Sequence, residues 1–142
     1  MDPINLLFSF SGRINRAKYW LAFLIWFVLW IVLLVLMFMS GFSTTTIVTA
    51  IIVAIPSFLS GIAIGIKRLH DRNKSGWWLL LFYLAPGILD GIGRGAGGIG
   101  FVFSLASLAI TIWAFVELGC LRGTIGVNRY GPDPVAPKPA QH

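Results

Sequence analysis

The chain alternates between long apolar runs and short polar segments, and the first two runs are longer than the helices of a soluble domain usually are. Residues 19–39 form a run of 21 residues without a charge, and residues 47–66 form a second run of 20. At about 1.5 Å per residue, a helix of this length crosses roughly 30 Å of hydrocarbon. The pattern therefore predicts two membrane-spanning helices in the first half of the chain.

The second half holds two further apolar runs of unequal length. Residues 99–121 give a full span with Glu117 near its end, whereas residues 77–92 give a short run that Pro86 interrupts and Asp90 breaks. Six glycines between positions 90 and 100 predict a flexible hairpin rather than a helix. We expect four transmembrane helices, the third short and Pro-interrupted. The alternative has three crossings, with residues 77–89 re-entrant or interfacial.

The composition agrees with a membrane location, because 57% of the residues are hydrophobic, 11% are charged and the mean hydropathy is +0.85. A soluble domain of 142 residues could not bury that much apolar surface. The expected fold class is an all-α, polytopic membrane helix bundle without β-sheet. We divide it into a basic, amphipathic N-terminal segment (1–18), a transmembrane domain (19–121) and a proline-rich tail (122–142).

The basic residues are distributed very unevenly over the two sides of a four-span arrangement. Ten of the eleven lysines and arginines fall on the side of the two termini, and Arg94 alone falls on the other. Because lysine and arginine strongly prefer the cytoplasmic side, we expect both termini in the cytoplasm. We attribute the net charge of +6 to contact with the membrane surface and expect no nucleic acid partner.

Three motifs resemble one known family. They are F-S-G-R-I-N-R-A-K-Y-W at residues 10–20, K-R-L-H-D-R-N-K-S-G-W-W at residues 67–78, and N-R-Y-G-P-D-P at residues 128–134. This combination is similar to the bacterial inner-membrane family catalogued as domain of unknown function 805. The resemblance implies a multi-pass protein of the bacterial inner membrane and attaches no activity to it.

The chain departs from that family in two ways. Many members look like three-crossing proteins whose third helix leads almost directly into the terminal motif, whereas this chain inserts a glycine-rich turn and another span. Lys18 stands where members often carry glutamate, so Asn15 is expected to cap the first long helix without a capping box.

His70 and Asp71 are the first candidates for chemistry. Adjacent residues of a helix point about 100° apart, so Asp71 is poorly placed to orient His70 as an acid–base pair. We favour an ion pair of Asp71 with Arg13, Arg16 or Arg68, and a lipid-headgroup site is the alternative. We expect no catalytic residues.

Glu117 is the second candidate, because a carboxylate within an apolar span usually faces a partner or a water-filled path. We expect it to pair with Arg122 or Arg68, and the alternative is a role in ion or proton passage. The chain has one cysteine, Cys120, and two histidines, His70 and His142. We therefore expect no disulfide, no metal and no other cofactor.

Small residues recur at spacings of four in the second apolar run, at Ser57, Gly61 and Gly65. This spacing places them on one helix face and favours close helix packing. We expect packing within one bundle, and a dimer seam is the alternative.

The leading functional hypothesis is a non-enzymatic scaffold or accessory subunit with a basic collar on the cytoplasmic face. The collar would contact anionic lipid headgroups, a membrane protein partner or further copies of the chain. Its candidate residues are Arg13, Arg16, Arg68, His70, Asp71, Arg72 and Arg129. The alternative is a small oligomeric transporter or channel that uses Glu117, and a membrane-embedded enzyme ranks third.

Overall fold

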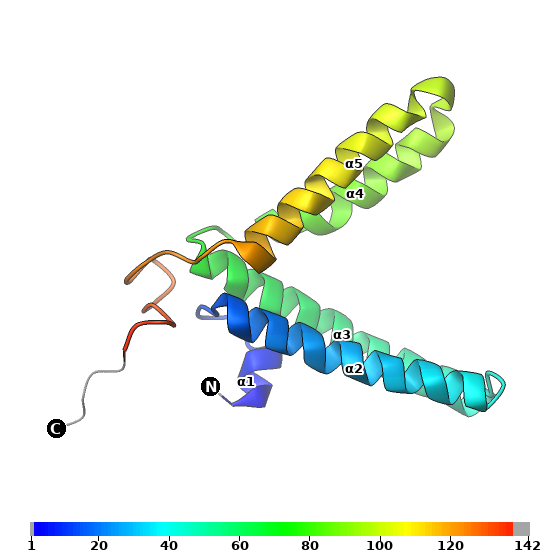
Figure 1. The fold of residues 1–142 in the computed structure, drawn as a ribbon, viewed down its shortest axis with the longest axis horizontal. Coiled ribbons are helices and arrows are strands. Elements are labelled where there is room, and N and C mark those ends of the chain that lie inside the picture. Colours follow the sequence, from blue (N-terminus) through cyan, green and yellow to red (C-terminus); the bar gives the residue numbers. More distant parts are fainter. Residues whose placement is uncertain (1, 138–142) are drawn as a thin grey trace.

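The structure is a computed structural model that describes residues 2–137, and in this range the chain forms two long helical hairpins preceded by one short helix (Figure 1). The elements are α1 (Pro3–Phe8), α2 (Arg16–Met39), α3 (Thr44–Asp71), α4 (Trp78–Gly95), the 3-10 turn η1 (Gly97–Ile99), α5 (Gly100–Phe115) and the π-helical segment η2 (Val116–Cys120). Within residues 2–137 there is no strand, only an isolated bridge between Asn128 and Gly131. The predicted all-α class is confirmed for this part of the chain.

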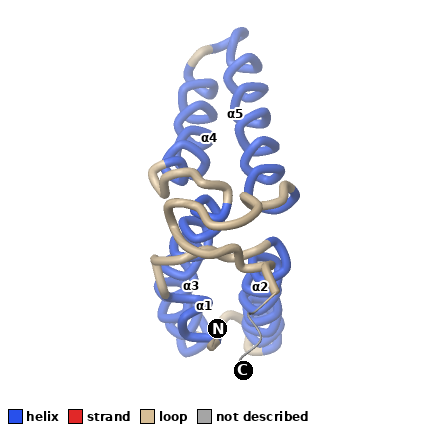
Figure 2. The backbone as a smooth tube through the Cα atoms, turned by 90° about the vertical axis from the view of Figure 1, so that its left-hand side faces the viewer, coloured by secondary structure: helices blue, strands red, loops and turns tan. Residues whose placement is uncertain are grey.

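The two hairpins, α2–α3 and α4–α5, share one end and diverge from it (Figure 1). At the shared end α2 and α4 begin, and α3 and α5 with its π-helical extension finish. Loop segments lie between the two hairpins at this end (Figure 2). The polar stretches that are far apart in the sequence are therefore brought together.

The start of α2 confirms the predicted cap. The side chain of Asn15 accepts a hydrogen bond from the backbone N–H of Lys18 at 2.9 Å, and the first turn holds no acidic residue. Asn15 thus pairs one of the amides that a helix start leaves free, without the reciprocal glutamate of a capping box.

The second helix is longer than the apolar run that predicted it. α3 passes through Pro56 and continues to Asp71, five residues beyond the expected end of the span at residue 66. Its last turns carry the charged side chains Lys67, Arg68 and Asp71, all buried. Partners from other segments make this polar extension of a membrane helix possible.

The glycine-rich region forms the turn of the second hairpin, but the prediction that it is not helical is wrong for residues 91–95. α4 stays helical through Gly95, and the turn is confined to Ala96 and the short segment Gly97–Ile99. A Cβ atom on Gly93 would lie 2.9 Å from the carbonyl oxygen of Gly100, so α4 and α5 approach closely here. This packing outweighs the low helix propensity of glycine.

Among the residues that the structure describes, three helical stretches are long and apolar enough to cross a membrane: Arg16–Met39, Thr44–Asp71 and Gly97–Cys120. α4 is not among them. Many large apolar side chains on α2 and α5 are exposed, such as Phe23 and Leu105. Such surfaces are expected to face lipid, since water would disfavour so large an apolar area.

Buried apolar contacts concentrate near the shared end. One cluster joins α1 and the segment before α2 to α3, and a second cluster joins α3 to α4 and η2. The second cluster consists of Leu69, Leu79, Phe82 and Leu118. The core therefore lies where the hairpins meet and positions the charged groups around it.

Candidate functional site

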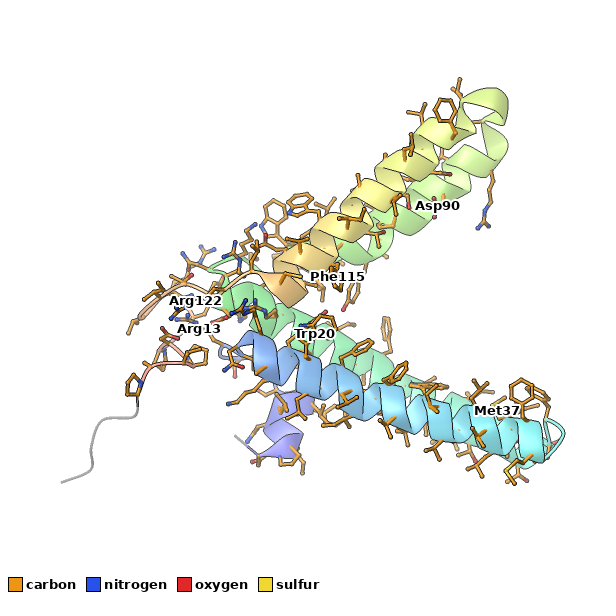
Figure 3. All side chains as sticks on the ribbon, in the orientation of Figure 1. Arg13, Trp20, Met37, Asp90, Phe115 and Arg122 are labelled. Atoms are coloured by element: carbon orange, nitrogen blue, oxygen red, sulfur yellow. The ribbon has the colours of Figure 1, made fainter. Side chains whose placement is uncertain are left out.

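The helix ends at the shared end surround a cluster of charged side chains, which we call the polar junction. Its members are Arg13, Lys67, Arg68, Asp71, Arg72 and Glu117. Figure 3 shows Arg13 and Arg122 at this end, whereas Met37 and Asp90 lie well along the two diverging hairpins. The three motifs of the sequence all contribute to the surroundings of the polar junction.

Asp71 lies at the centre of the polar junction between two arginines. Its Oδ1 accepts a hydrogen bond from Nε of Arg13 at 3.1 Å and lies 3.0 Å from Nη2 of the same side chain. Its Oδ2 accepts from Nη1 of Arg68 at 2.6 Å. The three side chains are at most 3% exposed, so the network is buried. The predicted ion pair of Asp71 is confirmed, with Arg13 and Arg68 as the two partners.

Arg13 also holds the C-terminal motif in place. Nη1 donates to the carbonyl oxygens of Gly126 and Gly131 at 2.7 and 3.1 Å, and Nη2 donates to that of Thr124 at 2.5 Å. The backbone of Thr124 returns a bond to the carbonyl of Asp71 at 2.7 Å. One side chain of the first motif thus ties the tail to the end of α3.

The end of η2 is capped by side chains from two other helices. Four carbonyl oxygens at this end, three in η2 and that of the following Leu121, accept bonds: Leu118 and Leu121 from Arg68, Gly119 from Trp20, and Cys120 from Arg16. The last carbonyls of a helix lack internal partners and carry partial negative charge, so arginine is a favourable cap there. Arg16 and Arg68 thus stabilise the end of the last predicted span by binding its carbonyl oxygens.

Glu117 is buried in η2, with a side chain that is 4% exposed. Its Oε1 accepts from Nε of Arg72 at 2.9 Å and forms an ion pair with Nζ of Lys74 at 3.2 Å. The prediction that Arg122 or Arg68 would be the partner is wrong, because Arg122 meets Arg72 through its carbonyl oxygen and Arg68 turns to Asp71. Arg72 and Lys74, which directly follow α3, are thus the cations that lie beside the Glu117 carboxylate.

Lys67 is a buried member of the junction that the sequence analysis did not single out. Its Nζ donates to the carbonyl oxygens of Asn5 and Leu6 at 2.8 and 2.5 Å, at the end of α1. The ammonium group therefore caps the short helix and fixes it against α3. In the sequence, this contact is indicated only by the short apolar stretch that forms α1 and by the lysine that begins the second motif.

His70 lies apart from the Asp71 network. Its Nδ1 donates to the carbonyl oxygen of Gly12 at 3.2 Å, and its ring stacks on that of Tyr130 with the centroids 3.9 Å apart. The carbonyl of His70 accepts from Nδ2 of Asn128 at 2.9 Å. The histidine thus joins all three motifs through packing and backbone contacts.

The candidate collar residues divide into two groups by exposure. Arg13 and Arg68 are buried, whereas Arg72 is half-buried and Arg16 and Arg129 are exposed. Of these arginines, only Arg16 and Arg129 are exposed on the surface.

The small residues of α3 contact neighbouring helices of the same chain. The hydroxyl of Ser57 accepts from Nε1 of Trp30 at 3.2 Å, and a Cβ atom on Gly65 would lie 2.6 Å from Cδ1 of Leu79. Gly61 leaves open space beside its backbone. Packing within one bundle thus accounts for Ser57 and Gly65.

The buried polar side chains of the described residues are all paired. Every buried side-chain nitrogen or oxygen atom in residues 2–137 has a hydrogen-bond partner. Within the same range no three histidine, cysteine or acidic side chains gather as a metal ion would require. The geometry is that of a closed network that fixes helix ends.

The fold and this junction define an all-helical integral membrane protein. The chain belongs to the family described as "Protein of unknown function (DUF805)", whose model matches residues 7–132. That range contains the three motifs almost completely, ending inside the third.

Curated relatives agree with this placement. YiiR of Escherichia coli K12, named as uncharacterized, is 37% identical over 135 residues, which cover 89% of this chain and 86% of the relative. The inner membrane proteins YhaI and YhaH of the same organism are 30% and 31% identical, over 89% of this chain and 86% and 87% of theirs. No solved structure matches the chain.

Proposed function

We propose that this protein is a four-span inner-membrane scaffold or accessory subunit without catalytic activity, whose junction lies at the cytoplasmic face. The observation that carries the proposal is the network around Asp71, in which Arg13 of the first motif binds both Asp71 of the second and the carbonyl of Gly131 in the third. Groups that are buried and fully paired serve positioning better than reaction. The exposed cations around this network are then available to bind a partner.

The pairing of α4 with α5 supports a fourth crossing. The two helices lie side by side along their length (Figures 1 and 2), and the hydroxyl of Ser107 donates to the carbonyl of Pro86 at 3.1 Å. If Gly97–Cys120 crosses the bilayer, its neighbour lies at the same depth. The 18 residues of α4 are about 27 Å long as a helix, close to the hydrocarbon thickness.

The distribution of charge supports the cytoplasmic placement of the junction. In the described range, every lysine and arginine except Arg94 belongs to the segments at the shared helix end, and Lys138 lies outside that range. The positive-inside preference then places this end, and both termini, in the cytoplasm.

Arg16 and Arg122 are exposed next to the buried network, on the side of α2 and η2. We call these two exposed arginines the rim. Each cation near an anionic leaflet contributes about 1 kcal/mol of attraction. We therefore propose that the rim holds anionic lipid around the protein and offers a docking surface for the acidic segment of a membrane partner.

Native mass spectrometry of the protein, extracted with its surrounding membrane and without detergent exchange, tests this function. A stoichiometric second protein, or a shell enriched in anionic lipid, supports the proposal. Either should decrease in an Arg16→Gln, Arg122→Gln double variant and persist in the control Arg94→Gln. Retention of neither, or equal retention in all variants, contradicts it.

Flux measurements in proteoliposomes distinguish the transport alternative from the scaffold proposal. Glu117 is already held by Arg72 and Lys74, so we expect no flux under an ion or proton gradient. Flux in the wild-type protein that disappears in Glu117→Gln would replace the scaffold proposal with transport.

A further inference from the structure

A cavity of about 600 Å³ lies between α3 and α4, beside the polar junction. Its walls are formed by one face of α3, from Phe58 to His70, and by the first turns of α4, down to Leu84. The cavity is a groove that is partly open to the surroundings. It lies near the end where the two hairpins meet, and the hairpins diverge beyond it (Figure 1).

The groove has one polar end and a long apolar remainder. His70, Ser75 and Tyr130 line it near the polar junction, whereas Ile62 and Phe58 line it farther along α3. The 12 residue-to-residue steps from Phe58 to His70 correspond to about 18 Å along the helix. Half of the hydrocarbon core is about 15 Å thick. The groove thus has the length and polarity of one lipid chain in a single leaflet.

A cation stands at the polar end. The guanidinium of Arg129 lies 4.9 Å from the ring centroid of Tyr130, whose ring stacks on His70. Arg129 is exposed and donates through Nη2 to the carbonyl of Asn73 at 3.1 Å, which leaves its other N–H groups for a phosphate. None of the described residues that line the groove is an aspartate or a glutamate.

We propose that this groove binds one acyl chain of an anionic phospholipid, with the lipid phosphate held by Arg129. The inference rests on the proposed function, which places the polar junction at the membrane surface. It adds a specific, single-lipid site to the general attraction of the exposed rim.

The test uses the full chain in nanodiscs of equal phosphatidylglycerol and phosphatidylethanolamine, followed by native mass spectrometry after removal of loosely bound lipid. The wild-type protein should retain one phosphatidylglycerol. Leu80→Trp, which fills the groove, should reduce this retention at least tenfold. Ile88→Trp, an exposed position of α4 outside the groove, is the control and should retain the lipid.

A second variant addresses the headgroup without altering the apolar walls. Arg129→Gln changes an exposed side chain and should fold, keep one lipid and lose most of the preference for phosphatidylglycerol. Arg94→Gln, an exposed arginine of α4 in the glycine-rich region, should keep the preference. If Leu80→Trp retains as much phosphatidylglycerol as the wild type and Arg129→Gln keeps the same lipid preference, the groove site is wrong. Occupation of the groove by a phosphate-free lipid or by a second copy of the chain also overturns it.

These outcomes are distinct from a failure of the proposed function. If the groove variants retain the lipid of the wild type while Arg16→Gln, Arg122→Gln loses its anionic shell or partner, the groove site is wrong and the scaffold proposal stands.

Discussion

Asp71 is the single residue on which most of the junction depends, because it balances two buried arginines. Asp71→Asn removes the charge and leaves Arg13 and Arg68 without a carboxylate. Breaking a buried ion pair on one side costs about 3–5 kcal/mol. We therefore expect a clearly lower melting temperature of the purified protein in lipid nanodiscs.

The matched control is Asp90→Asn, since Asp90 forms no ion pair within residues 2–137. Its melting temperature should stay near that of the wild type. Equal melting of the two variants would mean that the Asp71 network does not stabilise the fold.

Asp133 provides a pH-dependent contact in the tail. The backbone N–H groups of Val135 and Gly126, at 2.9 and 3.0 Å, hold the pKa of this carboxyl below its usual range. A lowered folded-state pKa stabilises the turn above the unfolded pKa, near pH 4, and the effect is lost as the pH falls through the folded value. The turn is thus fully held at neutral pH.

We expect the Asp133 carboxyl, followed by NMR, to titrate below an ordinary aspartate. The amide signal of Gly126 should shift with the same midpoint and should lose this shift in Asp133→Asn. A midpoint at or above the ordinary value would show that these hydrogen bonds are absent in solution.

At the scale of elements, the contact between α4 and α5 depends on a pair of glycines. A Cβ atom on Gly100 would overlap the carbonyl oxygen of Gly93, and a backbone atom cannot turn away as a side chain can. Gly100→Ala should therefore push the helices apart and cost roughly 1–3 kcal/mol, as overpacking usually does. Gly98→Ala is the control, because its Cβ meets open space.

Thermal unfolding in nanodiscs measures this difference, and Gly100→Ala is expected to melt below both the wild type and Gly98→Ala. If Gly100→Ala melted like its control, α4 and α5 would not approach at this point. The pairing argument for a fourth crossing would then lose its main contact.

The apolar runs were sufficient to predict the long helices but not their ends. α3 continues to Asp71 because its charged side chains form ion pairs and hydrogen bonds with buried partners. The charged residues in the sequence do not indicate which residues those partners are. α4 continues to Gly95 because of its contact with α5. The π-helical end of α5 has its carbonyls taken by Arg68 and Arg16, which lie far away in the sequence.

At the scale of the whole molecule, the junction was predictable where local charge sufficed. Asp71 stands among arginines in its own motif, so an ion pair was expected, and Arg68 is three residues away. The partners of Glu117 are 45 and 43 positions away, and only the folded arrangement of α3, α4 and η2 selects Arg72 and Lys74 over Arg122.

The arrangement of both hairpins on one junction leads to a prediction of topology. With four crossings, the turn at Gly98 lies on the periplasmic side and Ala136 lies in the cytoplasm. With three crossings, in which residues 77–89 are re-entrant, both positions exchange sides. The two models therefore differ at two independent sites.

Single-cysteine labelling distinguishes them, after the exposed Cys120 is replaced by serine. In right-side-out membrane vesicles, an impermeant maleimide should label Gly98→Cys and Thr44→Cys but leave Ala136→Cys unlabelled until the membrane is opened. Thr44 is the first residue of α3, at the far end of the first hairpin, and serves as the reference for the periplasmic side in both models. Labelling of Ala136→Cys together with protection of Gly98→Cys would establish three crossings. The junction would then not unite four helix ends at one membrane surface, because the tail that Arg13 holds would have to lie across the bilayer from Arg13 itself.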